Sequence, residues 1–348
     1  MLYNLKSLKE AQVSGKTVLL RADLDVPIEN SQILDDSRLN SWFPTLEYLL
    51  GNGAKIIIVG HLGRPNGADK NLTLLPVANW IATKLKAQIV EEKIGDFDGW
   101  KITDSVSLIE NIRFYKEEEE NDQEFARKLA QLGTIFVNDA FATAHRSHAS
   151  TEGIAHFIPS YAGLRVLQEV EVLSRVLESP DRPLGVVIGG AKIETKLPLV
   201  EKMHSLADYV MVGGEIAEND KVLLKVQHEK VSDRKSVLLV ADLNQSRQDI
   251  TAKSAENFLQ LLADAKTIVW NGPMGKIEDP DFQNGTLTLA EGIINIRAYS
   301  ILGGGDTIGF LRSKTLLDKF SFVSVGGGAM LEFLSGDRLP GLTVLEQK

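Results

Sequence analysis

Short runs of aliphatic residues alternate with helical patterns along the whole of this 348-residue chain. Most of these runs, such as VLL at 18–20 and IIIV at 56–59, are continuously apolar rather than alternating. Strands that are apolar on both faces are typical of a parallel sheet with helices on both sides. The alternation therefore predicts a doubly wound α/β fold, with ligands at the carboxyl ends of the strands.

Ten runs are predicted to be strands. They lie at 16–23, 54–61, 106–114, 134–141, 184–191, 208–215, 236–242, 266–273, 298–305 and 321–328. Among the helical patterns between them, residues 35–53 predict a helix that Asp36 or Ser37 caps at its start and Gly51 or Gly53 ends.

The length predicts two domains, because a single hydrophobic core stops growing at about 250–300 residues. A long helical pattern at 161–179 leads into the loop PDRP and is the predicted join. We expect two doubly wound, Rossmann-like parallel-sheet domains joined by this helix as a hinge, over residues 1–160 and 161–335.

The ends of the predicted strands differ between the two halves. In the second half they carry glycines, at 189–190, 213–214, 272, 303–305 and 326–328. In the first half they carry charged residues: Arg21, Asp23, His61, Arg64, Arg113, His145 and Arg146. Glycine allows phosphate to approach backbone amides, and guanidinium groups bind small anions in a fork. The second half is therefore predicted to bind nucleotide phosphates, and the first a small anion.

The composition excludes several classes of protein. The net charge of −9 argues against binding to nucleic acid or to anionic membranes. The absence of cysteine excludes thiolate metal sites and cysteine nucleophiles. No apolar stretch approaches the roughly 20 residues that span a bilayer, and the start has no signal-peptide pattern. We therefore expect a cytoplasmic protein.

Three local patterns have both a structural and a functional interpretation. Lys192 and Lys196 lie four residues apart after a double glycine, so on a helix they share one face, which is either solvated or faces a phosphate. The acidic run at 116–122 is predicted to be a solvated helix start. His145 and His148 have no acidic partner at ligand spacing, so no metal is expected there.

Motifs of the whole chain, in order, resemble the phosphoglycerate kinase family. They are VLLRADLDVP, DDSRL, GHLGRP, IENIRF, NDAFATAHRSHAST, GGAKIETKL, WNGPMGKIE, GGGDT and GGGAMLEFL followed by LPG. The resemblance implies a monomeric, hinge-bending glycolytic enzyme. Such an enzyme reversibly transfers the acyl phosphate of 1,3-bisphosphoglycerate to magnesium ADP, giving 3-phosphoglycerate and ATP. It also implies that the tail, about 336–348, packs on the N-terminal domain.

The resemblance assigns a role to each matching residue. It implies phosphoglycerate binding by Asp23, Asp25, Arg38, His61, Arg64, Arg113 and Arg146. It implies nucleotide binding by Lys196, Gly213, Asn271, Pro273, Glu278, Gly304, Gly305, Asp306 and Thr307. It implies that Asp306 holds Mg²⁺, and that the groups acting on the transferred phosphoryl are Arg38, Lys192, Gly304 and Gly327.

The chain also departs from the family pattern. Asp25 in DLD replaces the usual asparagine of DFN, and Val325 and Met330 remove two hydroxyl groups from the usual STGGGAS. Lys276 stands where an apolar residue is usual, GGEIA replaces GGGMA, and the segment 215–249 is short. Two alternatives are therefore kept. One is a non-catalytic nucleotide-binding relative; the other is an NAD-dependent dehydrogenase, although no ribose-binding acid follows its glycine strand.

Overall fold

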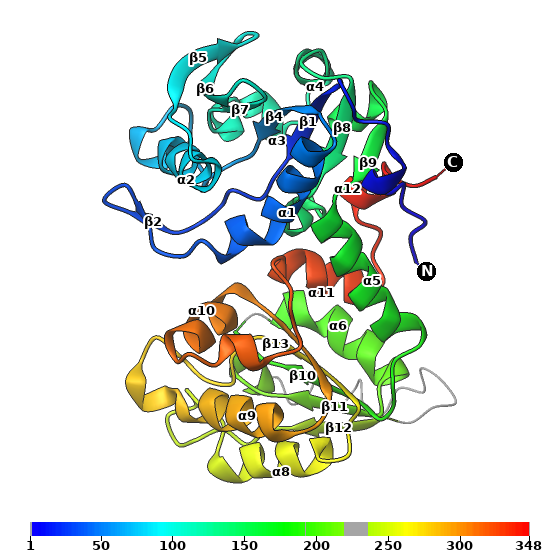
Figure 1. The fold of residues 1–348 in the computed structure, drawn as a ribbon. Helices are drawn as coiled ribbons and strands as arrows, with labels where there is room; N and C mark the ends of the chain where they lie inside the picture. Colours follow the sequence, from blue (N-terminus) through cyan, green and yellow to red (C-terminus); the bar gives the residue numbers. More distant parts are fainter. Residues whose placement is uncertain (1, 192, 219–235, 348) are drawn as a thin grey trace. The chain divides into compact units, whose positions relative to one another are not determined.

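The computed structural model describes residues 2–191, 193–218 and 236–347. The chain forms two compact units, Met1–Glu171 with Arg338–Lys348, and Val172–Asp337. Each unit holds one mainly parallel sheet, so the predicted fold class is confirmed (Figure 1). The division between the units falls inside helix α5 (Leu164–Glu178), the helix that the sequence predicts as the join.

Seven strands form the sheet of the first unit, in the order β5-β6-β7-β4-β1-β8-β9. Their bounds are Thr17–Arg21 (β1), Lys55–Val59 (β4), Val90–Ile94 (β5), Phe97–Thr103 (β6), Val106–Ile109 (β7), Ile135–Asn138 (β8) and Ser160–Ala162 (β9). Strands β7, β4, β1, β8 and β9 are parallel, whereas β5 and β6 add an antiparallel edge. The sequence did not predict β5, because four of its five residues are exposed and it has no apolar pattern.

Helices cover both faces of this sheet, and a small separate hairpin lies near α2. The bounds are Ser37–Gly51 (α1), Leu75–Leu85 (α2), Lys116–Glu119 (α3), Gln123–Ala130 (α4) and Pro340–Thr343 (α12), with the hairpin strands Ile28–Glu29 (β2) and Gln32–Ile33 (β3). Trp42 of α1 and Ile81 of α2 pack on Leu20 and Ile58 of one face, whereas Phe125 of α4 packs with Leu19 of the other.

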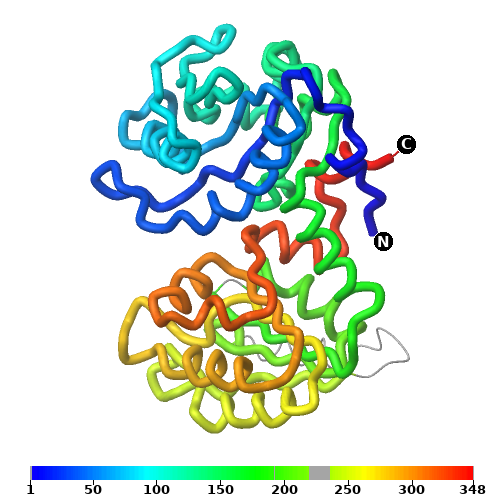
Figure 2. The backbone as a smooth tube through the Cα atoms, in the orientation of Figure 1, coloured from blue at the N-terminus to red at the C-terminus, as the bar shows by residue number. Residues whose placement is uncertain are grey.

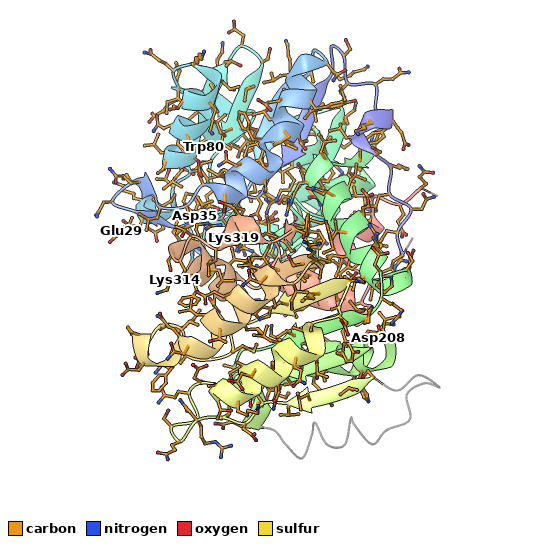
Figure 3. All side chains as sticks on the ribbon, turned by 60° about the horizontal axis from the view of Figure 1, so that its bottom comes forward. Glu29, Asp35, Trp80, Asp208, Lys314 and Lys319 are labelled. Carbon is orange, nitrogen blue, oxygen red and sulfur yellow. The ribbon has the colours of Figure 1, made fainter. Side chains whose placement is uncertain are left out.

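The predicted helix at 35–53 is confirmed as α1, but its predicted side-chain cap is wrong. Asp36 occupies the N-cap position without a capping hydrogen bond, and its Oδ2 atom accepts from Trp80 Nε1 at 3.0 Å instead. Asp35 accepts from the Ser37 amide at 2.9 Å, and the C-cap is Asn52 rather than a glycine. Figure 3 labels Asp35 and Trp80.

The two ends of the chain lie close together within the first unit (Figure 2). The Lys6 amide donates to Leu345 O, and the Gln347 amide donates to Asn4 O, both at 2.9 Å. The Leu339 amide donates to the buried Tyr3 hydroxyl at 2.6 Å. These bonds fix the C-terminal segment to residues 3–6 of the chain.

The second unit contains a six-stranded parallel sheet in the order β12-β11-β10-β13-β14-β15. Its strands are Leu184–Ile188 (β10), Tyr209–Val212 (β11), Val237–Val240 (β12), Thr267–Asn271 (β13), Tyr299–Gly303 (β14) and Phe322–Val323 (β15). Its helices are Ile193–Leu206 (α6), Ala252–Leu262 (α8), Asn284–Asn295 (α9), Gly305–Ser313 (α10) and Gly327–Ser335 (α11). All ten predicted strands are thus present.

The order of connections creates a switch point in each sheet. In the first unit the chain runs outward from β1 to one side and then returns to β8 on the other. In the second unit the same change of direction separates β10 from β13. Doubly wound sheets bind ligands outside the carboxyl ends of the strands at such points. At the opposite, amino end of β10 and β11, Asp208 accepts from the Leu184 amide and from Arg182, both at 2.7 Å; Asp208 is labelled in Figure 3.

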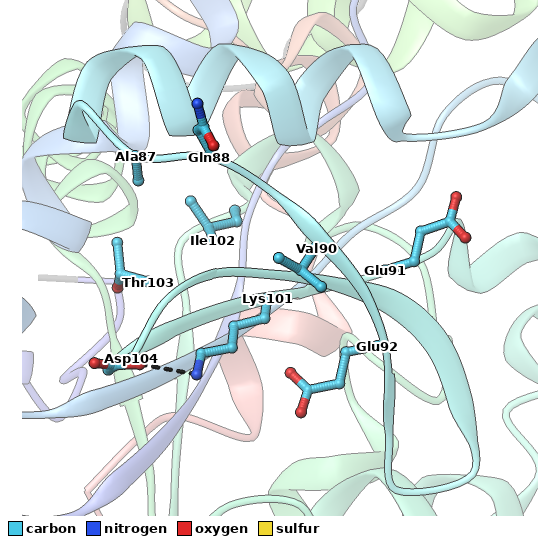
Figure 4. A pocket seen from close by; sticks show the side chains of 9 residues that line it. All are labelled: Ala87, Gln88, Val90, Glu91, Glu92, Lys101, Ile102, Thr103 and Asp104. Atoms are coloured by element: carbon cyan, nitrogen blue, oxygen red, sulfur yellow. Dashed lines mark ion pairs between the residues drawn. The ribbon is translucent and has the colours of Figure 1, made fainter.

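A surface cavity of about 640 Å³ lies beside β5 and β6 in the first unit (Figure 4). Its lining includes Val90, Glu92, Lys101 and Asp104. Because Thr103 pairs with Val106, the first residue of β7, this cavity lies near the amino end of that parallel strand. Within the described residues, no helix is both long enough and apolar enough to cross a membrane.

Candidate active site

Arg21, the last residue of β1, is the centre of a buried polar group in the first unit. Its side chain is 1% exposed, its Nε donates to Ser150 Oγ at 2.9 Å, and its Nη2 lies 2.9 Å from His61 Nδ1. A guanidinium group has no acceptor atom, so His61 Nδ1 accepts this hydrogen bond. The ends of β1 and β4 are thereby linked.

Asp23 and Asp25 follow β1 and face Arg38 at the start of α1. Arg38 Nε lies 3.4 Å from Asp23 Oδ2, and Arg38 Nη1 donates to Asp25 O at 2.7 Å. Asp25 Oδ1 accepts from the Gly63 amide at 2.9 Å. Burial raises the pKa of Asp23, and Arg38 opposes this rise. Neither carboxylate oxygen of Asp23 has a well-formed hydrogen bond within the described chain, so it keeps acceptor capacity for a ligand.

Arg113 and Arg146 extend this basic group from the segments that follow β7 and β8. Arg113 Nη1 donates to Gly63 O at 2.7 Å, whereas its buried Nη2 has no hydrogen-bond partner among the described residues. Burial, reinforced by Arg146, lowers the pKa of Arg113 to about 10. Arg146 Nε lies 3.4 Å from His145 Nε2. Arg64 is exposed in the loop after β4, and its side chain makes no hydrogen bond or ion pair with another described residue.

The electrostatics of this end of the sheet favour an anion. Burial lowers the pKa of His61 well below its usual value, and Arg21, Arg113, Arg146 and Arg38 each lower it further. His61 is therefore neutral near pH 7, and the positive charge is carried by the arginines. Guanidinium groups with free N–H donors at one strand edge suit a phosphate or carboxylate ligand.

The glycines that follow β10, β11 and β13 in the second unit allow three loops to pack closely. The amides of Gly189, Gly190 and Gly213 donate at 2.9 Å to Asn271 O, Pro273 O and Ile188 O respectively. A Cβ atom on Gly272 would lie 2.2 Å from Gly189 O. These three amides are bonded within the protein, so the prediction that the glycines here expose amides to phosphate is wrong for them; the glycines allow the loops to pack.

The glycines after β14 have different surroundings. Gly304 has a φ of +95°, and nothing lies within 4 Å of a Cβ atom added to Gly305, where α10 begins. Asp306 is exposed in the first turn of α10, and Thr307 is fully buried with no hydrogen-bond partner for Oγ1 among the described residues. A helix N-terminus with open space and an unpartnered hydroxyl is suited to phosphate. A Cβ on Gly327, at the start of α11, would lie 3.1 Å from Gly304 Cα. The starts of α10 and α11 are therefore next to each other.

Lys196 of α6 lies at the switch point between β10 and β13. Its ammonium group donates to Asn271 Oδ1 and is largely buried. Burial lowers the pKa of Lys196 to about 8, and Asp306 opposes this. Asn271 Nδ2 lies 3.9 Å from Met330 Sδ, so a residue that departs from the family pattern touches this group. Glu278 is exposed in the turn after β13, and Lys192 lies outside the described residues.

Among the described carboxylates of the second unit, Asp306 fits a metal only together with a ligand that supplies further donors. No group of three or more His, Cys, Asp or Glu side chains that could hold a metal occurs in the described part of the chain. Magnesium in phosphate-transfer sites binds through one or two carboxylates together with substrate phosphates and water. The single exposed carboxylate of Asp306, beside the open start of α10, fits that arrangement.

Comparison with known proteins agrees with this geometry. The protein-family model described as phosphoglycerate kinase matches residues 8–237 and 219–337. A phosphoglycerate kinase of Dictyoglomus turgidum is 39% identical, with 98% of each chain covered. The chain belongs to the phosphoglycerate kinase family. Solved phosphoglycerate kinases of Coxiella burnetii and Pyrococcus horikoshii have TM-scores of 0.81 and 0.79 at 34% and 29% identity, again with 98% of each chain covered.

One buried carboxylate of this phosphoglycerate kinase family member was not predicted. The run at 116–122 is predicted to be solvated, but Glu118 within it is 0% exposed, so the prediction is wrong there. Its two carboxylate oxygens accept from the amide and the hydroxyl of Ser150, at 2.8 and 2.6 Å. Nothing distinguishes Glu118 from its three acidic neighbours in the sequence, so only the fold reveals its position.

Proposed function

We propose that this chain catalyses the reversible transfer of the acyl phosphate of 1,3-bisphosphoglycerate to magnesium ADP, giving 3-phosphoglycerate and ATP in glycolysis. Membership of the phosphoglycerate kinase family supports this reaction. The observation that carries the proposal is the division of chemistry between the two units. Guanidinium groups gather at the strand ends of the first unit, and an open glycine-capped helix start lies in the second.

The first unit is the proposed phosphoglycerate-binding domain. Arg113, Arg146, Arg64 and His61 hold the phosphate that is not transferred, and the free Nη2 of Arg113 is a donor for it. Asp23 accepts from the substrate hydroxyl with its unfilled oxygens. Arg38 lies near the reacting carboxyl group, with Asp25 beside it.

The second unit is the proposed nucleotide-binding domain. Gly304, Gly305 and Thr307 bind phosphate oxygens at the start of α10, and Lys196 neutralises their charge. The remaining nucleotide contacts are proposed for Asn271, Pro273 and Glu278. Gly213, predicted as a further contact, has its amide bonded to Ile188 O, so its proposed part is to let these loops pack. Asp306 would hold Mg²⁺, which supplies charge neutralisation on the nucleotide phosphates when bound.

Catalysis in this proposal depends on position and charge. An acyl phosphate is already an activated donor, so no protein nucleophile is needed, and preorganised positive groups stabilise the charge that spreads over the transferred phosphoryl. Arg38, Lys192, Gly304 and Gly327 are assigned to this task, Lys192 from the sequence motif alone. Transfer requires the two ligands to meet, so hinge closure is part of the proposal. The protein is proposed to act as a cytoplasmic monomer.

A coupled assay of ATP formation from 1,3-bisphosphoglycerate and ADP tests the function. The account predicts ATP formation that requires magnesium. A non-catalytic relative would bind ADP without forming ATP. An NAD-dependent dehydrogenase would instead change nicotinamide absorbance without any nucleoside diphosphate.

A further inference from the structure

A continuous chain of hydrogen bonds runs from Glu118 to the edge of the anion-binding cluster. Glu118 accepts from both the amide and the hydroxyl of Ser150, and Ser150 Oγ accepts from Arg21 Nε at 2.9 Å. Arg21 Nη2 then donates to His61 Nδ1 at 2.9 Å. All four side chains are buried, with exposed fractions of 3% or less.

The direction of every hydrogen bond in this chain is fixed by chemistry. Arg21 can only donate, so the Ser150 oxygen and the His61 Nδ1 atom must both accept from it. Ser150 therefore turns its own hydrogen toward Glu118. Since Nδ1 of His61 carries no proton, the neutral ring carries its proton on Nε2. That nitrogen lies 3.8 Å from Asp25 Oδ2, on the side where Asp23, Asp25 and Arg38 meet.

We propose that Glu118, through Ser150 and Arg21, is a positioning residue that fixes His61 as a neutral Nε2–H donor toward the anionic substrate. The inference rests on the proposed function, which identifies the anionic substrate as phosphoglycerate. It gives Glu118, the buried acid of the segment 116–122, a role that does not require contact with the substrate. Loss of the Ser150 hydroxyl removes the hydrogen bond at Arg21 Nε and leaves those to Ala22 O and to His61 Nδ1. The guanidinium group is then held less firmly, which weakens the contact that selects the tautomer of His61.

A neutral donor has a specific value in this cluster. Four guanidinium groups already surround His61, and each of them disfavours a fifth positive charge. A neutral imidazole adds a directed hydrogen bond to a phosphate or carboxylate oxygen without that repulsion. It also does so without taking up a proton when substrate binds, because the donor hydrogen is already in place.

Two-bond ¹H–¹⁵N spectra of the full chain, labelled in histidine, report the tautomer of each ring. His61→Gln assigns the His61 signals among the six histidines. In the unchanged protein we expect the Nε2–H tautomer for His61, with and without substrate. Ser150→Ala should mix the tautomers and raise the KM for 3-phosphoglycerate roughly ten-fold, the scale of one lost charge-assisted hydrogen bond, while kcat and the KM for ATP stay unchanged.

Ser160→Ala is the matched control, because it removes a hydroxyl that donates at 2.8 Å to Ile158 O, with no link to His61. It should leave the tautomer and both KM values unchanged. If Ser150→Ala does not fold, Glu118→Gln keeps the side-chain volume and replaces one of the two oxygens that accept from Ser150 by an NH₂ group, so it tests the first link of the chain. An Nδ1–H or charged His61 in the unchanged protein overturns the inference, as does an unaltered KM in a folded Ser150 variant. If the protein lacks kinase activity, the proposed function fails, and the tautomer spectrum still judges the hydrogen-bond chain.

Discussion

The Nη1 atom of Arg38 donates a hydrogen bond to the backbone oxygen of Asp25 at 2.7 Å and lies 3.6 Å from that residue's Oδ2 atom. Part of the Arg38 guanidinium group is therefore engaged by Asp25, and its remaining N–H groups can donate to a substrate that binds beside it. The carboxylate of Asp25 adds a negative charge to a site proposed to bind an anion, at a position where the family usually has a neutral amide.

Asp25→Asn should lower the KM for 3-phosphoglycerate, roughly three- to ten-fold, because one repulsive charge near the ligand is removed. The side-chain oxygen of the introduced asparagine can still accept from the Gly63 amide, so the loop contact is kept. Steady-state kinetics at several salt concentrations is the measurement. Asp104→Asn is the control, because it removes an exposed carboxylate at the opposite end of the sheet. A raised KM in the Asp25 variant would show that its carboxylate serves binding directly.

Arg146→Ala should weaken 3-phosphoglycerate binding about ten-fold or more and leave ADP binding unchanged, because its charge lies in the first-unit cluster. Titration calorimetry with each ligand separately gives both affinities. Arg127→Ala, which removes an exposed arginine paired with Glu124 on α4, is the control and should change neither. Equal losses for both ligands in the Arg146 variant would refute the division of binding between the units.

Lys196 should make ATP binding depend on pH. Burial places its pKa at about 8, below the usual 10.5, so the free lysine loses its charge as the pH rises through about 8. Bound phosphates favour the charged form, so the KM for ATP should rise several-fold between about pH 7.5 and about pH 9. Lys196→Ala should raise the KM at neutral pH and remove this dependence. Lys202→Ala, an exposed lysine of the same helix, should keep it. If the KM for ATP in Lys196→Ala still rises with pH, the titrating group is a residue other than Lys196.

Asp139 should make the stability of the first unit depend on pH. Its Oδ1 atom accepts from the amides of Arg165 and Val166 at the start of α5, and burial raises its pKa to about 7. The folded state therefore binds a proton that the unfolded state releases above about pH 4. The stabilisation of the folded state by protonated Asp139 is fully present below about pH 4 and is lost as the pH rises through about 7.

Urea unfolding should consequently show a free energy of unfolding about 1 kcal/mol lower at pH 8 than at pH 6 from this group alone. Asp139→Asn, which can still accept from both amides, should remove that difference. Asp122→Asn, at the N-cap of α4, is the control and should retain it. Identical pH dependence in the Asp139 variant and the unchanged protein would contradict the assignment.

The parallel core of both sheets could be predicted from the sequence because each central strand is apolar on both faces. Strand β5 could not, since its exposed residues leave no pattern for a strand that is held by pairing with β6. The charges at the strand ends were also predictable, because parallel strands bring their carboxyl ends to one edge. Arg21, His61 and Arg113 do meet there.

What the sequence could not show is which polar groups face inward. Nothing in the sequence distinguishes Glu118 from its acidic neighbours, and only tertiary packing brings its carboxylate into hydrogen-bond contact with Ser150. The glycines present the same difficulty. Gly190 and Gly305 both follow strands, yet the amide of Gly190 is bonded to Pro273 O, whereas Gly305 borders open space.

Trapping the product in the direction of ATP consumption tests the central claim most directly. With 3-phosphoglycerate, magnesium ATP and hydroxylamine, transfer forms an acyl phosphate that hydroxylamine converts to a hydroxamate and inorganic phosphate. The account predicts one hydroxamate for each ADP formed, and no turnover when either 3-phosphoglycerate or magnesium is left out. ADP formation without hydroxamate, or binding of both ligands without any turnover, would contradict it.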